Sequence, residues 1–218
     1  MWKKALIFFF FLLVFAFTAL MFTKISPYFT SFSKELNFLS TKPIGLLTNE
    51  TFFWGFYTHI TSSLWVLALG IIQFIPYIFR TYPTVHKLAG KIYCISILAL
   101  AAPSGLVLAY YANGGLPAQV GFSFQCVIWW LSTYQAWQEA LRKNWIKHIE
   151  MMLISYAVTL AAMSLRGESY LLFYLFHTKP IETYLTVTWF SWTFNIFVAK
   201  LLIMNHLPKK LLEAYRLK

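Results

Sequence analysis

The fold of this chain is decided by the apolar run Val85–Tyr111, which reads VHKLAGKIYCISILALAAPSGLVLAYY. A helix of about 20 predominantly apolar residues crosses the roughly 30 Å of hydrocarbon in a bilayer. The run is longer than that, contains no acidic residue, and carries its only charged side chains, Lys87 and Lys91, near its beginning. It therefore predicts a transmembrane helix.

Five further apolar runs lie on either side of this stretch. Their approximate limits are Ala5–Phe22, Phe52–Phe79, Gln119–Ala140, Ile146–Leu165 and Ile181–Asn205. The connectors between them contain the helix breakers Pro and Gly, as in Asn113–Pro117 and Lys179–Pro180. The sequence therefore predicts an all-α fold, a polytopic membrane bundle of about six transmembrane helices.

The composition of the whole chain supports a membrane protein. Of the 218 residues, 59% are hydrophobic and 11% charged, with a mean hydropathy of +0.62. Soluble domains have about 45–50% apolar and about 25% charged residues, so a water-soluble globular enzyme, a disulfide scaffold and a disordered tail are excluded. The net charge of +11 lies mostly in short connectors, so we attribute it to membrane topology and expect no nucleic-acid partner.

The predicted organisation has four parts. Residues 1–24 form an N-terminal transmembrane helix, 25–51 an extracytoplasmic loop or interfacial segment, 52–206 a five-helix membrane core, and 207–218 a basic cytoplasmic tail. The first run is longer than the roughly 7–15-residue apolar core of a cleaved signal peptide and ends in large residues, so we predict an uncleaved helix.

The distribution of Lys and Arg predicts the orientation. With the N-terminus inside, twelve basic residues fall on the cytoplasmic side and five outside, as the positive-inside rule requires. The twelve are Lys3, Lys4, Arg80, Lys87, Lys91, Arg142, Lys143, Lys147, Lys209, Lys210, Arg216 and Lys218. We therefore expect both termini in the cytoplasm.

The acidic residues limit the chemistry. All seven are glutamates and none lies in the middle of a predicted span. Paired carboxylates for acid–base hydrolysis and buried carboxylates for ion coupling are therefore missing. Histidine, arginine and amide side chains remain, and ionisable groups within spans usually face the bundle interior.

These polar side chains recur at helical spacing. In the second predicted span His59, Gln73 and Arg80 lie on one face. In the fifth, His148 and Arg166 share a face about 27 Å apart along the axis. The candidate ligand-binding residues are His59, Gln73, Arg80, His86, His148, Arg166 and Asn195. Each of these residues also has a purely structural interpretation. The histidines can be interfacial or hydrogen-bonded within the protein, Arg166 can extend to the lipid headgroups, and the polar side chains can form hydrogen bonds between helices.

In their order along the chain, these motifs resemble a large family of bacterial predicted membrane proteins, domain of unknown function 2306 (DUF2306), from about Phe56 to Leu202. They are His59, Gly70-Ile71-Ile72-Gln73-Phe74, Arg80, His86-Lys87-Leu88-Ala89-Gly90-Lys91-Ile92-Tyr93, His148-x-x-x-Met152-x-x-Ser155-Tyr156-Ala157-x-Thr159, Arg166 and Trp192-x-x-Asn195. Ile154 departs from the pattern, since the family often has a basic residue before its Ser-Tyr pair. The resemblance implies a multi-pass protein of the bacterial inner membrane and no particular reaction.

Three functions stay open. The bundle binds or transports a small anionic or amphipathic molecule along a polar path between Arg80 and Arg166. Alternatively, it carries electrons through haem b or quinone, with His86 and His148 as axial ligands of one haem. The third alternative is a non-catalytic accessory membrane subunit. A haem requires the two histidines to face each other, whereas transport requires a polar cavity reaching His59 and Arg166.

Overall fold

The computed structural model describes residues 2–216, except for the side chains of Trp2, Lys3, Lys4, Leu6, Asn37, Tyr215 and Arg216. The described residues form helices and no strand. The long elements are α1 (Trp2–Ile25), α3 (Glu50–Ile72), α5 (Pro83–Ile95), η3 (Ser96–Ala101), α6 (Ala102–Tyr110), α7 (Leu116–Leu141), α8 (Trp145–Thr159), α9 (Ala161–Phe176) and α10 (Pro180–Met204). The short ones are η1 (Ser26–Phe29), α2 (Asn37–Ser40), η2 (Ile44–Leu46), α4 (Pro76–Thr81) and α11 (Leu207–Arg216).

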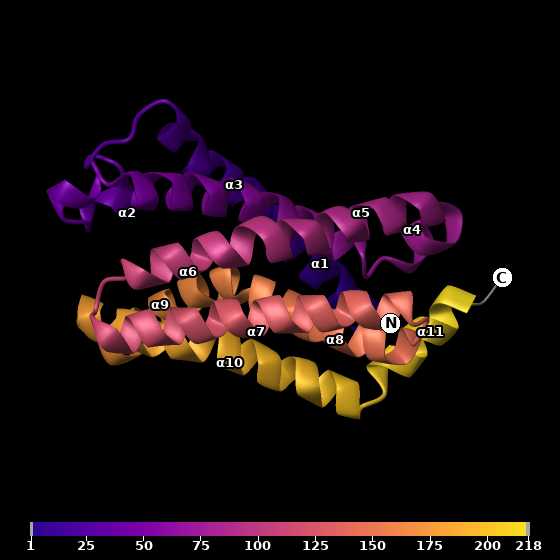
Figure 1. Ribbon diagram of the computed structural model, residues 1–218. Coiled ribbons are helices and arrows are strands. Elements are labelled where there is room, and N and C mark those ends of the chain that lie inside the picture. The colour runs from indigo at the N-terminus through magenta and orange to yellow at the C-terminus, as the bar shows by residue number, and fades with distance from the viewer. Residues whose placement is uncertain (1, 217–218) are drawn as a thin grey trace.

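The chain runs back and forth along one elongated bundle (Figure 1). Successive passes pack against each other: α1 on α3, α3 on the continuous α5–η3–α6 helix, α6 on α7, α7 on α8, and α9 on α10. The start of α1 and the end of α11 lie at the same end of the bundle (Figure 1). The placement of both termini in the cytoplasm stays a prediction.

Four helical stretches are long and apolar enough to cross a membrane: Ile7–Phe29, Glu50–Ile72, Pro83–Tyr110 and Pro180–Met204. Helices α8 and α9 together form a fifth candidate, bent by 45°. Helix α7 has the length of a span, but its four glutamines lower its hydropathy, and it packs among α6, α8 and α10. The all-α membrane bundle is confirmed, with four or five candidate spans where about six were expected.

Two predicted runs are broken in the structure. The second was expected to continue to Phe79, but α3 ends at Ile72 and α4 begins at Pro76 after the extended residue Ile75. A residue before proline is disfavoured in helical conformation, which explains the break. The fifth run bends at Leu160, so the single straight helix assumed for His148 and Arg166 is wrong: His148 lies on α8 and Arg166 on α9.

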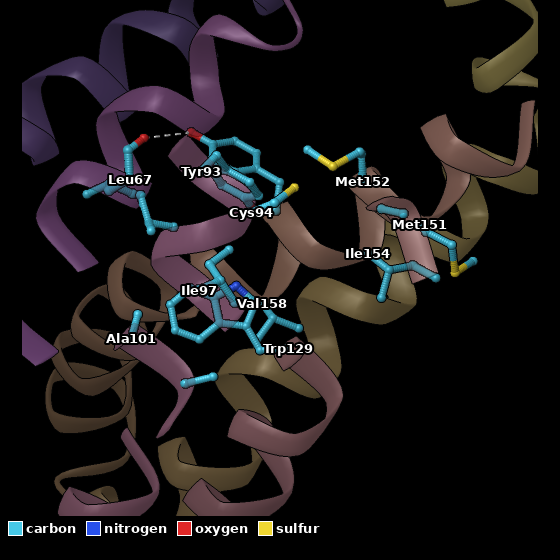
Figure 2. Packing of buried hydrophobic residues seen from close by; sticks show 14 of the residues in the cluster. Leu67, Tyr93, Cys94, Ile97, Ala101, Trp129, Met151, Met152, Ile154 and Val158 are labelled. Carbon is cyan, nitrogen blue, oxygen red and sulfur yellow. Dashed lines mark hydrogen bonds between the residues drawn. The ribbon is translucent and has the colours of Figure 1, made fainter. Parts of the chain in front are cut away.

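The core is built around Gly70 of α3 and two tyrosines. A Cβ atom at Gly70 would lie 2.5 Å or less from two ring carbons of Tyr156 and 2.9 Å from the ring of Tyr93. Only glycine allows this approach without displacing the rings. Figure 2 shows Tyr93 beside Leu67 and Cys94, and Trp129 of α7 beside Ile97 and Val158; all of them belong to one buried cluster.

One end of the bundle, which we call the aromatic end, is covered by residues 26–49. Tyr28 and Leu39 of this segment are buried against Phe52 and Phe56 of α3. Lys42 is 2% exposed, and its Nζ donates to the Tyr111 carbonyl (2.7 Å) and to Asn113 Oδ1 (3.1 Å). The segment, predicted as an extracytoplasmic loop or interfacial segment, is thus fastened to α3 and to the α6–α7 connection.

The opposite end, which we call the basic end, contains α4, the start of α5, the α7–α8 turn and α11. Helix α11 occupies the predicted basic tail and packs against α4, α8 and α10. Arg80 of α4 donates from Nε and Nη2 to the Ala214 carbonyl in the last turns of α11. This charge-assisted contact holds the C-terminal helix on the bundle.

Candidate functional site

The structure brings His86 and His148 together at the basic end. His86 lies in the first turn of α5 and His148 in the first turn of α8, and both turns lie at this end of the bundle. His148 Nδ1 lies 2.8 Å from the Ala136 carbonyl of α7 and therefore donates its hydrogen there. That bond leaves His148 Nε2 with a free lone pair, the state in which imidazole binds metals.

A hydrogen bond deeper in the bundle fixes the register of the two helices. Tyr93 follows His86 by seven residues on α5, and Ser155 follows His148 by seven on α8. Tyr93 Oη and Ser155 Oγ are 2.9 Å apart. Seven residues make two turns, about 10 Å along a helix, so equal offsets bring the histidines to one level. The Tyr93–Ser155 contact thus positions the histidine pair.

Ser155 and Tyr93 belong to a fully buried hydroxyl network. Thr133 Oγ1 lies 2.7 Å from Ser155 Oγ, and Tyr93 Oη lies 3.1 Å from Thr159 Oγ1. Trp129 Nε1 donates to Thr159 Oγ1 at 3.0 Å. None of the five side chains is more than 7% exposed. The network links α5, α7 and α8, where each such bond stabilises a membrane bundle by about 0.6 kcal/mol.

His59 lies apart from the other two histidines. Its Nδ1 donates to the Ala101 carbonyl at 2.9 Å, at the end of the π-helical turn η3 that precedes Pro103. A proline and a π turn leave backbone carbonyls without their usual helical donors. Trp130 of α7 and Ser104 donate to two others, Leu98 and Leu100. His59 therefore satisfies the backbone of an interrupted helix.

Gln73 contacts the helix that begins with His86. With its amide nitrogen facing the His86 carbonyl, Gln73 donates to that oxygen (3.3 Å) and accepts from the Gly90 N–H (3.2 Å). A Cβ atom at Gly90 would lie 3.0 Å from the nearer end of the Gln73 amide group, so glycine admits this contact. Gln73 thus binds the backbone of α5 beside the histidine pair.

Asn195 joins the two halves of the bent α8–α9 pair. Its Nδ2 donates to the Ala157 carbonyl in the last turn of α8 (3.1 Å). Its Oδ1 accepts from Ser164 in the first turn of α9 (2.9 Å). Carbonyls in the last turn of a helix have no N–H donor within the helix, and the Asn195 amide provides a donor for one of them. Asn195 therefore stabilises the bend.

The two arginines predicted to line a path lie in unrelated surroundings. Arg80 is bound to α11 at the basic end. Arg166 donates to the Ala162 carbonyl of its own helix (2.7 Å), and its guanidinium lies 5.7 Å from the ring centre of Phe17 in α1. The structure brings together His86, His148 and Gln73, and separates them from His59, Arg166 and Asn195.

Two hollows on the described surface are lined by none of the seven predicted site residues. One, of about 370 Å³, lies between α9 and α10 and is lined by residues that include Leu165, Phe173 and Tyr184. The other, of about 270 Å³, lies between α6 and α7 beside Pro103 and Trp130. Both are lined mainly by apolar atoms, and neither forms a polar path through the bundle.

The sequence analysis did not select Trp129 and Thr133, because it considered histidine, arginine and amide side chains. Their spacing of four on α7 places them on one helix face, a signal that was present in the sequence. It also missed Lys42, whose burial depends on the fold of residues 26–49.

Comparison with known proteins gives one match. The family model described as "Predicted membrane protein (DUF2306)" matches residues 56–203, more than half of the chain. The matched range extends from α3 to the last turn of α10 and includes all seven predicted site residues. No curated protein and no solved structure matches the chain.

Proposed function

The chain belongs to the DUF2306 family of predicted membrane proteins, and we propose that this multi-pass membrane protein binds one haem b between His86 and His148 and carries electrons in the bacterial inner membrane. The observation that carries the proposal is that His86 and His148 lie in the first turns of α5 and α8, each two turns before one partner of the Tyr93–Ser155 hydrogen bond. Bis-histidine ligation requires two imidazoles on facing helices at equal depth.

The donor set fits a haem. Both residues are histidines, and neutral imidazole is a common axial ligand of haem iron. The Nδ1–H bond from His148 to the Ala136 carbonyl orients the ring and raises the basicity of Nε2, as carbonyls that accept from metal-binding histidines do. Bound haem would supply one-electron chemistry.

The polar-path alternative receives less support from the geometry. The amide of Asn195 and the hydroxyls of Tyr93, Ser155 and Thr159 are hydrogen-bonded inside the protein. The two hollows described above are apolar and lie elsewhere. The same internal hydrogen bonds favour the accessory-subunit function as a second candidate, because a membrane subunit without a ligand uses such bonds to hold its helices together.

An absorption spectrum of the detergent-purified protein, recorded before and after dithionite, tests the proposal. Expression with ample haem should give a sharp reduced band in the wild-type protein, and the band should disappear in His86→Ala and in His148→Ala. His177→Ala is the matched control because this histidine lies in the α9–α10 connection at the aromatic end. Its spectrum should equal that of the wild-type protein.

A featureless spectrum in folded, haem-supplemented protein would refute haem binding and leave the accessory function. A band that survives in both His86→Ala and His148→Ala would refute these residues as ligands. Thermal unfolding of each variant shows whether it is folded.

A further inference from the structure

Several lysines at the basic end have no partner among the residues that the structure describes. Lys87 and Lys91 are exposed on the first turns of α5, Lys143 on the α7–α8 turn and Lys209 on α11. None of the four makes a hydrogen bond or ion pair within residues 2–216. We call these four residues the basic surface.

The carboxylates at this end do not neutralise the basic surface. Glu139 accepts from Arg142 (3.2 Å) and Asn144 (2.8 Å) and so closes the α7–α8 turn. Glu150 is paired with Lys147 at 3.0 Å. Glu213 on α11 is the one other carboxylate in the elements of this end. The end therefore carries a local excess of positive charge that is open to solvent.

Aromatic side chains indicate the depth of the basic surface in a membrane. Tyr77, Tyr82 and Trp145 are 64%, 53% and 44% exposed at the same end of the bundle. Exposed Tyr and Trp side chains of membrane proteins gather at the headgroup level. Val85 and Leu88, next to the lysines on α5, are also largely exposed and need acyl chains rather than water as neighbours.

We propose that the basic surface binds the headgroups of anionic phospholipids in preference to zwitterionic ones. The chemistry required is a phosphate with net negative charge at the headgroup level and an acyl chain beside Val85 and Leu88. Lysine ammonium groups supply point charges for such phosphates. The exposed apolar neighbours favour a lipid over a soluble anion. The inference does not depend on haem binding.

Native mass spectrometry of the full-length protein, released from a non-ionic detergent with equimolar phosphatidylglycerol and phosphatidylcholine, tests the proposal. The wild-type protein should retain several-fold more phosphatidylglycerol. Lys87→Gln/Lys91→Gln/Lys209→Gln should lose this preference. The matched control is Lys24→Gln/Lys34→Gln/Lys179→Gln, which removes three exposed lysines at the aromatic end. It should retain the wild-type preference.

Equal retention of the two lipids by the wild-type protein would overturn the proposal, as would an equal loss in both triple variants. A further sample contains excess inorganic phosphate. Displacement of phosphatidylglycerol by phosphate would show a site for a free anion, whereas retained lipid supports the proposal. Thermal unfolding of both triple variants checks that these exposed substitutions leave the fold intact.

Discussion

The two ends of the bundle are closed by different kinds of interaction. At the aromatic end, residues 26–49 bury Tyr28 and Leu39 against Phe52 and Phe56, and the one cation in the contact, Lys42, is buried. At the basic end, α11 is held by the exposed Arg80, and the four lysines of the basic surface have no partner among the described residues.

The difference indicates where function resides. Burial of aromatic side chains stabilises in proportion to the apolar area removed from water and needs no ligand. The lysines of the basic surface and Nε2 of His148 have no partner among the described residues and can therefore bind a ligand. The aromatic end therefore provides stability, and we place the chemistry at the basic end.

The largest effect should follow from Phe56→Ala. Phe56 is 2% exposed and contacts the rings of Tyr28, Phe38 and Phe52. Loss of a buried Phe side chain costs about 3–5 kcal/mol. Denaturant titration in detergent should show this loss, while the reduced haem spectrum stays unchanged. Leu88→Ala, an exposed position at the basic end, is the control. An equal loss in both variants would contradict the contrast between the ends.

A smaller, pH-dependent effect should come from Lys42. Burial lowers the pKa of Lys42 from its ordinary 10.5 to about 8. Between pH 8 and 10.5 the unfolded chain therefore binds more protons than the folded one, so the free energy of unfolding rises with pH. The slope is at most about 1.4 kcal/mol per pH unit for one proton. Below pH 8 both states are protonated and the slope disappears.

Lys42→Met provides the reference for this measurement, because other groups titrate in the same range and contribute equally to both proteins. Unfolding titrations at intervals from pH 7 to 10.5 should give a wild-type curve that gains stability on the variant as the pH rises. Parallel curves would show that Lys42 keeps an ordinary pKa.

The smallest effect on global stability should come from Arg80→Gln. The substitution removes the charge-assisted bonds to the Ala214 carbonyl at an exposed site, so unfolding should change by no more than about 0.5 kcal/mol. Local opening of α11 should nevertheless increase several-fold, which limited trypsin cleavage after Lys209 and Lys210 measures. Arg142→Gln at the same end is the control, and equal cleavage in the two variants would show that Arg80 does not hold α11.

Part of the candidate site could be predicted from residue spacing alone. The positions of His86 and His148 at the starts of their helices follow from the breakers and basic residues before them, because these mark helix ends at the membrane surface. The sequence analysis also named the two as ligands of one haem. The contact between Tyr93 and Ser155 could not be predicted, because periodicity specifies which face a residue occupies on its own helix and not which helix that face meets.

The sequence by itself determined the all-α membrane bundle, because apolar runs longer than the bilayer is thick leave helices as the simplest way to satisfy their backbone hydrogen bonds. It also determined the excess of positive charge at one end. Tertiary structure alone decided that Asn195 stabilises the α8–α9 bend, that His59 donates to a carbonyl of the interrupted α5–α6 helix, and that Tyr93 is hydrogen-bonded to Ser155. Each of these roles depends on a partner distant in the chain, and only packing selects that partner.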